Sequence, residues 1–339
     1  MRQHVQRGQV GGPLRLDARA QAQQDLPAPV HHGVGVVGAA VQGGEERVIG
    51  RLPVGDVHAV MVHHTTDNAP WSSSVASAEP SFSVLPGADE SPVILHVPHS
   101  AREIPDAVRD GILLDDAALA RELDHLTDAH TAEIAEAAAA RASVTPWRFV
   151  NRLSRLVVDP ERFPDEREEM LAAGMGAVYT RTTRGEPLRP AGTDPAGLVG
   201  RYFDPYARAM TEAVAGRLAA TGRAVVLDVH SYPSARLPYE LHGEGPRPPV
   251  CLGTDPFHTP PALSAAAREA FAPCGPTGLD SPFAGAYVPL AYYGTEPGVS
   301  ALMVEIRRDL YMAEPGGPAG PGLTRLARAL AVLVDAVTR

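Results

Sequence analysis

The chain has 339 residues, a formal net charge of −10 and a hydrophobic fraction of 44%. Its length gives a soft expectation of two domains, although one α/β domain can reach about 250 residues. The acidic balance argues against nucleic acid or an anionic membrane surface as the main partner. No stretch approaches the roughly 18 consecutive apolar residues of a membrane span. The composition is that of a globular protein.

The first 90 residues differ from the rest of the chain. They mix Gly, Gln and Pro with isolated apolar residues and run into a Ser- and Pro-rich stretch from Trp71 to Pro86. This composition predicts a poorly structured extension, which can also be a partner-binding segment. True initiation near or after Met61 is an equally open interpretation. The pairs His31-His32 and His63-His64 are not expected to bind metal, because adjacent side chains point in different directions.

The two cysteines, Cys251 and Cys274, do not form a CxxC motif. A chain of this length can bury a large core without cross-links. We therefore expect both thiols to be buried small hydrophobic groups, neither a disulfide nor a metal pair. The N-terminal residues lack the pattern of a signal peptide. These features together favour the cytoplasm.

From Pro92 onward the hydrophobic pattern becomes regular and predicts one domain over residues 91–339. Short apolar runs predict strands at Val93–Leu95, Phe149–Val150, Leu156–Val158, Ala224–Val229, Val250–Gly253 and Ala301–Ile306. Helices are predicted from a cap at Asp115 or Asp116 through Ala117 to about Arg141, from a cap at Asp204 with Pro205 at N1 to near Gly222, from Pro261 to Phe271 and from Leu323 to Val337. Alternating strands and helices imply a three-layer α/β fold whose mostly parallel or mixed sheet is flanked by helices.

Three of the predicted strands end in polar clusters, where open α/β sheets place their ligands. The clusters are His96-Val97-Pro98-His99-Ser100, Asp228-Val229-His230-Ser231 and Glu305-Ile306-Arg307-Arg308. A polar residue directly after several buried apolar ones is costly to desolvate, so it needs a partner or a task. Because alternate strand residues share a face, Asp228 can orient His230, or both can bind a cation.

A fourth polar group, Thr127-Asp128-Ala129-His130, lies within the first predicted helix. Its Asp128 can face the strand ends, whereas Glu133 and Glu136 are expected to face water. Two histidines and one carboxylate, here His99, His230 and Asp128, make a catalytic zinc set that leaves one position open. The alternative is that both histidines are ordinary, partly buried residues.

These motifs resemble the N-formylglutamate amidohydrolase family, in order, from Pro92 to Arg339. The matching residues are His96-x-Pro98-His99-Ser100, Ile104-Pro105, Thr127-Asp128-x-His130, Asn151-Arg152-Leu153-Ser154-Arg155, Val158-Asp159-Pro160-x-Arg162, Gly174-Met175-Gly176-x-Val178-Tyr179-Thr180, Asp228-x-His230-Ser231 and Glu305-x-Arg307-Arg308-x-x-Tyr311. The first 90 residues match nothing in this family.

The resemblance implies a phosphorylase/hydrolase-like fold, related to zinc exopeptidases such as carboxypeptidases, and one zinc ion per chain. Those enzymes take their first ligands from a His-x-x-Glu motif, but Arg102 stands three residues after His99 and cannot bind a metal. Asp128 is therefore the expected carboxylate ligand, with Asp124 and His96 as alternatives.

Glu305 is the expected general base, which accepts a proton and passes it to the leaving amine. An arginine is expected to stabilise the oxyanion. A salt bridge from Glu305 to Arg307 or Arg308 is the alternative interpretation. Asp228 and His96 are expected to orient the metal-binding residues.

An N-acylated acidic amino acid carries two carboxylates, which planar guanidinium groups bind well. Arg155 and Arg162 coincide with the family motif and are the expected substrate contacts, with Arg152 as a further one. Asn151 and Tyr179 can add hydrogen bonds. Alternatively, these arginines pair with the acidic residues of the same segment, which are Asp159, Glu161, Asp165 and Glu166.

The resemblance implies hydrolysis of N-formyl-L-glutamate to formate and L-glutamate, a step of histidine degradation. The alternatives are a carboxypeptidase-like peptidase, a deacylase for another N-acyl amino acid, and a non-catalytic binding domain of the same fold. The expected partner is a small molecule, with neither nucleic acid nor membrane involved.

Overall fold

The computed structural model describes residues 81–241 and 245–339. The predictions for initiation near Met61, for the pairs His31-His32 and His63-His64 and for residues 1–80 of the extension lie outside these residues. Within the described part, no helix combines the length and the hydropathy needed to cross a membrane. Both cysteines are buried and unpaired, as the sequence predicts.

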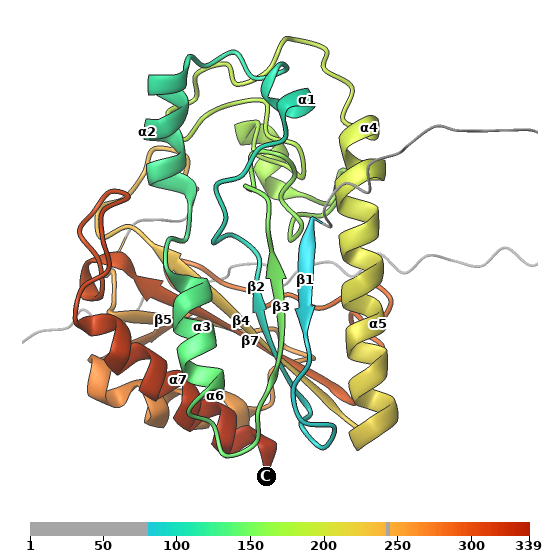
Figure 1. The fold of residues 1–339 in the computed structure, drawn as a ribbon, viewed down its shortest axis with the longest axis vertical. Coiled ribbons are helices and arrows are strands. Elements are labelled where there is room, and N and C mark those ends of the chain that lie inside the picture. Colours follow the sequence, from blue (N-terminus) through green and yellow to red (C-terminus); the bar gives the residue numbers. More distant parts are fainter. Residues whose placement is uncertain (1–80, 242–244) are drawn as a thin grey trace, which may run out of the picture. The chain divides into compact units, whose positions relative to one another are not determined.

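One sheet organises the described residues (Figure 1). Its strands are β1 Phe82–Leu85, β2 Val93–Val97, β3 Trp147–Asn151, β4 Ala224–Tyr232, β5 Val250–Gly253, β6 Thr277–Leu279 and β7 Val299–Arg307. Their order across the sheet is β1-β3-β2-β4-β7-β5-β6. The central strands β3, β2, β4 and β7 are parallel, while β1 and β5 run antiparallel to their central neighbours. The mostly parallel sheet confirms the predicted fold class.

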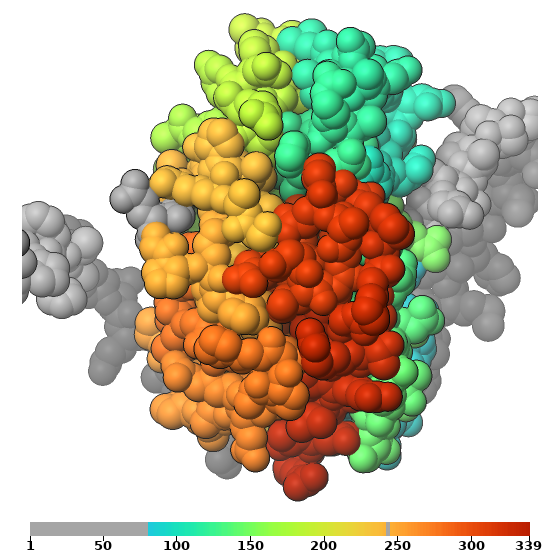
Figure 2. Space-filling model, turned by 90° about the vertical axis from the view of Figure 1, so that its left-hand side faces the viewer, coloured from blue at the N-terminus to red at the C-terminus, as the bar shows by residue number. Residues whose placement is uncertain are grey.

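The helices cover both faces of this sheet. They are α1 Asp106–Arg109, α2 Asp116–Leu126, α3 Thr131–Ala139, α4 Ala196–Leu198, α5 Asp204–Thr221, α6 Pro261–Phe271 and α7 Gly322–Thr338. Helices α3, α6 and α7 pack on one face and α5 packs on the other. Figure 2 shows the C-terminal residues packed side by side with the segment that contains α6.

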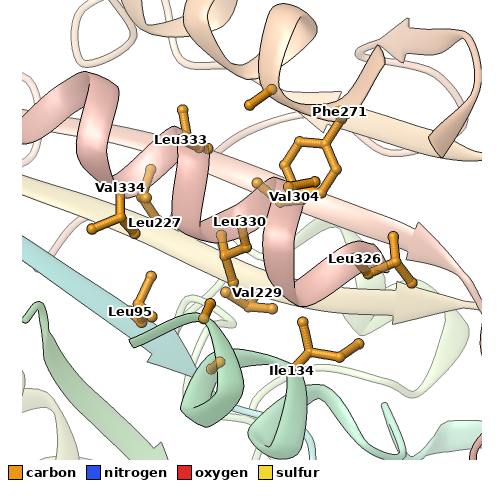
Figure 3. Packing of buried hydrophobic residues seen from close by; sticks show 14 of the residues in the cluster. Leu95, Ile134, Leu227, Val229, Phe271, Val304, Leu326, Leu330, Leu333 and Val334 are labelled. Atoms are coloured by element: carbon orange, nitrogen blue, oxygen red, sulfur yellow. The ribbon is translucent and has the colours of Figure 1, made fainter. Parts of the chain in front are cut away.

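Alternate strand residues build two cores, because successive side chains point to opposite faces of a sheet. Val229 and Val304 meet Leu330 and Phe271 in the core under α6 and α7 (Figure 3). The opposite face of β4 presents Val226 to the core under α5. On β4 and β7, the residues that alternate with the α7-facing ones are therefore free to carry polar groups at the strand ends.

The predicted helix from Ala117 to Arg141 is wrong, because the chain breaks between α2 and α3. Asp115 caps α2 as expected, accepting from the backbone N–H of Ala118 at 2.7 Å. Thr127 then becomes extended, and His130 adopts the left-handed region with φ 65°. The backbone N–H of Asp128 donates to the carbonyl of His99 at 2.9 Å instead of continuing the helix. This bond joins the segment to the end of β2.

Two further predicted elements differ. Residues Leu156–Val158 form a buried turn rather than a strand, since the N–H of Leu156 donates to Ser154 Oγ and the three side chains fill two cores. Asp204 is not a cap: it is helical, and a π-helical turn, Val199–Phe203, precedes it. Just before α4, Asp194 accepts from the N–H of Ala196 at 3.0 Å, although Pro195 is the N-cap residue of that helix.

Other predictions hold closely. β5 and α6 have the predicted bounds, and α5 ends at Gly222, whose φ of 75° suits glycine. β1 lies within the segment predicted as an extension and pairs with β3 at the edge of the sheet. The sheet therefore begins at a strand that the sequence pattern did not reveal.

The α7 core provides a test of this packing. Leu330→Ala should lower the free energy of unfolding by about 2–5 kcal/mol, because Leu330 is fully buried and truncation leaves a cavity. Val332→Ala is the control on the same helix, since Val332 is 53% exposed and should change stability little. Urea unfolding followed by circular dichroism measures both. Equal effects of the two substitutions would contradict the assigned face of α7.

Candidate active site

The polar ends of strands β2 and β4 lie next to each other. At this point the order in which the chain adds strands to the sheet changes direction. From β2 the chain moves outward to β3, and it later returns to place β4 on the other side of β2. Such a switch point leaves a crevice beyond the carboxyl ends of the two strands. The register sets His96 beside Asp228 and His230 beside Glu305. Residues far apart in the chain are thus brought together by strand pairing.

A cavity of about 750 Å³ opens over these strand ends. It is lined by the candidate residues His99, Asp128, Asp228, His230 and Glu305. All five are buried. The cavity is therefore the place where these side chains can meet a ligand.

The centre of the cluster is a pair of imidazoles. His99 Nδ1 and His230 Nδ1 are 3.2 Å apart. Asp128 Oδ2 lies 3.1 Å from His230 Nδ1 and 3.7 Å from His99 Nδ1. Ligands bound tetrahedrally at 2.0–2.1 Å from a zinc ion are roughly 3.3 Å from one another. The spacing of these three atoms fits ligands that share one cation, and they form one of the candidate metal-binding groups of the described residues.

Asp128 is held in place from the opposite side by Arg308. Arg308 Nη2 donates to Asp128 Oδ1 at 2.9 Å, and the same guanidinium also bonds Ser231 and the carbonyl of His125. Hydrogen bonds from His230 and His99 and the charge of Arg308 lower the pKa of Asp128 well below its ordinary value, although burial alone would raise it. Asp128 is therefore an anion with one oxygen directed at the two histidines.

Asp159 orients His99, a contact that the sequence did not reveal. Its Oδ1 is 2.9 Å from His99 Nε2, and its Oδ2 accepts from Arg155 at 2.7 Å and from Tyr179 Oη at 2.6 Å. Burial raises the pKa of Asp159, but Arg155 and His99 outweigh burial and hold the pKa well below its ordinary value. An ionised Asp159 fixes the imidazole so that Nδ1 faces His230.

Asp228 occupies a comparable position beneath His230. Its two oxygens lie 3.0 Å from His230 Nε2 and 2.9 Å from His96 Nδ1. The other nitrogen of His96, Nε2, is 2.5 Å from Tyr206 Oη. The predicted orienting role of Asp228 and His96 agrees with this geometry and remains a prediction.

Glu161 is a further carboxylate in the cluster. Its Oε2 is 3.1 Å from His230 Nε2 and 3.7 Å from His99 Nδ1, while its buried Oε1 has no hydrogen-bond partner among the described residues. Burial raises the pKa of Glu161, and the nearby Asp228 raises it further. The sequence analysis treated Glu161 as a partner of the neighbouring arginines. Here it competes with Asp128 as a metal ligand.

Glu305 lies opposite His230 on β7 and is 8% exposed. Its Oε2 has no hydrogen-bond partner within the described part of the chain. Burial raises the pKa of Glu305 to about 7, against the lowering effect of His230. The alternative salt bridges do not form, because Arg307 binds Asp309 and Arg308 binds Asp128. An unpaired carboxyl with a pKa near neutrality can accept and return a proton.

The cluster holds more negative charge than its basic neighbours neutralise. Burial lowers the pKa of His230, but Asp228 and Glu161 overcome burial and hold it well above its ordinary value. The pKa of His99 is also raised, since Asp159 and Asp128 outweigh burial and Arg155. The carboxylates thus favour positive charge between them, and a divalent cation supplies it. Together with the ligand spacing, this charge excess shows that the residues fit a metal ion.

Only some of the predicted substrate contacts reach the cavity. Arg155 and Arg162 line it. Asn151, Arg152 and Tyr179 do not, because Asn151 bonds the carbonyl of Pro98, Arg152 bonds Ser83 and Tyr179 bonds Asp159. Asp124, the alternative ligand, lies outside the cluster because it pairs with Arg102 at 2.8 Å.

Arg208 is a cavity residue that the sequence analysis missed. It projects from α5 and lines the cavity. Arg155 and Arg162 both pair with Asp159, and Arg308 pairs with Asp128. Among the described residues, no ion pair or hydrogen bond engages Arg208. No local motif marks this position, since its role depends on where α5 lies relative to the strand ends.

The fold and the cluster define a class of protein, a hydrolase with a histidine–carboxylate metal-binding group at the carboxyl ends of a mostly parallel sheet. The sequence profile of the N-formylglutamate amidohydrolase family matches residues 91–312. The chain therefore belongs to this family, which confirms the resemblance inferred from the motifs.

Relatives support this assignment. N-formylglutamate deformylase from Pseudomonas putida is 27% identical over 235 residues, which cover 66% of this chain and 82% of the relative. The crystal structure of N-formylglutamate amidohydrolase from Ralstonia eutropha gives a TM-score of 0.64 at 22% identity and covers 76% of this chain and 97% of that one. A gene product of Agrobacterium tumefaciens gives a TM-score of 0.57 at 20% identity, with 76% and 95% covered. These two structures share the fold.

The network around Asp159 leads to a stability prediction. Asp159→Asn in chelator-treated protein should lower the free energy of unfolding by about 3–5 kcal/mol, because the substitution leaves the buried Arg155 without its counter-charge. Asp165→Asn is the matched control, since Asp165 makes an exposed pair with Arg167 and should have little effect. Urea unfolding measures both variants. A small effect of Asp159→Asn would show that the buried pair is dispensable.

Proposed function

We propose that the protein catalyses metal-dependent hydrolysis of the amide bond of an N-acyl amino acid. N-formyl-L-glutamate, converted to formate and L-glutamate, is the first substrate to test, because the Pseudomonas putida relative is named for that reaction. The observation that carries the proposal is the convergence of His99, His230 and Asp128, with 3.2 Å between the two Nδ1 atoms. The two buried, unpaired cysteines agree with the cytoplasm as the proposed compartment.

His99, His230 and Asp128 would hold one zinc ion, with Glu161 as the competing carboxylate. When bound at such a site, zinc lowers the pKa of a water molecule and polarises a carbonyl group. Asp159 holds the imidazole of His99 by a hydrogen bond to Nε2, and Asp228 lies 3.0 Å from His230 Nε2. The protein's contribution is to fix these ligands before the ion arrives.

Glu305 performs the proton transfers in the proposed reaction. Its unpaired carboxylate oxygen accepts a proton from the attacking water as the carbon–oxygen bond forms. It then donates this proton to the amide nitrogen as the carbon–nitrogen bond breaks. A pKa of about 7 suits both steps, because the group can exist in either protonation state near neutral pH.

The amino-acid half of the substrate carries the negative charge. Arg155 and Arg162 remain proposed contacts because they line the cavity, although Asp159 already neutralises both in part. Arg208 offers a guanidinium without such a partner in the described structure. We therefore propose Arg208 as the main contact for a substrate carboxylate.

The metal ligands can be tested by zinc content. His230→Ala and Asp128→Asn should reduce bound zinc to well below one ion per chain, as measured by inductively coupled plasma mass spectrometry after gel filtration. Glu161→Gln should retain the ion, and Glu133→Gln, on the exposed face of α3, is the control. The opposite result for Asp128→Asn and Glu161→Gln would make Glu161 the third ligand.

Glu305→Gln should keep its zinc but lose turnover by roughly 10²–10⁴-fold, the usual contribution of general acid–base catalysis. The amide is nearly the same size as the carboxyl group but cannot accept a proton. Steady-state kinetics on N-formyl-L-glutamate, with zinc content measured on the same sample, check this outcome. A near-normal rate in this variant would assign the base to another residue.

Arg208→Ala should raise KM by about tenfold with little change in kcat, because a charge-assisted contact to the substrate is removed. Arg201→Ala is the control, since Arg201 is exposed on the preceding helical turn and does not line the cavity. An unchanged KM for Arg208→Ala would return carboxylate binding to Arg155 and Arg162.

A panel of N-formyl, N-acetyl and peptide substrates of glutamate and aspartate separates the competing functions. Cleavage of peptides in preference to N-acyl amino acids would indicate a peptidase. Zinc binding with no hydrolysis of any member would indicate a binding domain.

A further inference from the structure

The cavity is larger than an N-formyl amino acid requires. Its volume is about 750 Å³. N-formylglutamate has about twelve non-hydrogen atoms, and at the roughly 30 Å³ that a water molecule occupies in the liquid they fill about 360 Å³. About half of the cavity is therefore available for a larger substrate.

Aromatic side chains line part of this space. Phe163, Tyr232, Phe283, Tyr287 and Tyr293, here called the aromatic wall, all line the cavity. The rings of Tyr232 and Phe283 are 5.4 Å apart between centroids, and those of Phe163 and Tyr293 are 6.3 Å apart. The wall is built mainly from the segment between β6 and β7, with one contribution each from β4 and from the loop after β3. Such a surface favours apolar groups.

The aromatic wall starts beside the metal-binding cluster and ends at the surface. The ring of Tyr287 lies 4.6 Å from that of His96, which contacts Asp228. Tyr293 is 43% exposed. A substituent on the carbonyl carbon of a bound amide can therefore extend along the wall towards solvent.

The charged side chains that line the cavity are mostly acidic. Carboxylates outnumber guanidinium groups among the lining residues. Arg155, Arg162 and Arg308 already pair with acidic residues. An uncharged group therefore suits the wall better than a further carboxylate.

We propose that the acyl group of the physiological substrate is a bulky, uncharged, apolar group, an aromatic ring or an alkyl chain, that packs on the aromatic wall. This inference rests on the proposed amide hydrolysis and specifies its substrate class. The negatively charged amino-acid half is then left to Arg208, which lines the same cavity.

Kinetics of the zinc-loaded, full-length protein test this assignment. The ratio kcat/KM for N-phenylacetyl-L-glutamate should exceed that for N-formyl-L-glutamate by about tenfold or more. A preference for N-formyl-L-glutamate overturns the proposal. A preference for N-formyl-L-phenylalanine over both also overturns it, because the apolar group would then belong to the amine side.

Variants of one residue of the aromatic wall and one exposed residue of the cavity lining give a second test. Phe283→Ala and Leu290→Ala should each reduce the preference for the phenylacetyl over the formyl substrate by several-fold. Leu290 lines the cavity but is 48% exposed, so its replacement leaves the core intact. Phe257→Ala is the matched control, since Phe257 is 50% exposed and does not line the cavity. An unchanged preference in both cavity variants contradicts the proposal.

A binding measurement separates this inference from the proposed function. Isothermal titration calorimetry of the zinc-loaded protein should show about tenfold or tighter binding of phenylacetate than of acetate. If no amide is hydrolysed but phenylacetate binds in this way, the proposed reaction fails and the apolar acyl site stands. Equal affinity for the two acids overturns the inference whatever the activity.

Discussion

The buried carboxylates at the ends of β2 and β4 are the constraint on which the site depends. Asp128 lies between the two central imidazoles, Asp159 contacts that of His99 and Asp228 that of His230. Burial makes each of these charges costly unless it is compensated. Arg155 and Arg308 provide part of the compensation. Against the effect of burial, the uncompensated part raises the pKa of both histidines. The same electrostatics that bind a metal therefore fix the ligand geometry beforehand.

The chain leaves the helical conformation between α2 and α3, and this break positions Asp128 at the site. A continuous helix through residues 127–130 would satisfy its own backbone groups. Instead, the break lets the N–H of Asp128 bond the carbonyl of His99, and His130 takes a left-handed conformation that is uncommon for residues other than glycine. Local strain of this kind persists only where the surrounding contacts determine it. Arg308 and His230, which both bind Asp128, provide those contacts.

The sequence predicted the framework better than the site. The bounds of β5 and α6 follow from apolar patterning between clear breakers, which is local information. The break after Leu126 was missed because Ala, Leu and Glu on both sides favour a helix, while the competing bond to His99 is long-range. The prediction of a strand at Leu156–Val158 was wrong because a short apolar run has the same hydrophobic pattern in a buried turn as in a strand. Glu161 was not predicted as a residue of the cluster because the histidines that it contacts are distant in sequence. The arginines of its own segment are near and offered a simpler pairing.

Substrate recognition follows the same logic of charge compensation. Arg155 and Arg162 line the cavity but share Asp159, and drawing such a guanidinium away from a buried carboxylate costs several kcal/mol. A ligand carboxylate gains most from a cation whose partner the protein does not supply, as for Arg208 within the described structure. The aromatic wall favours uncharged groups. Burying apolar surface against its rings is favourable, and the rings cannot solvate a charge. A substrate with one charged half and one apolar half satisfies both surfaces at once, whereas a small dicarboxylate leaves the wall uncovered.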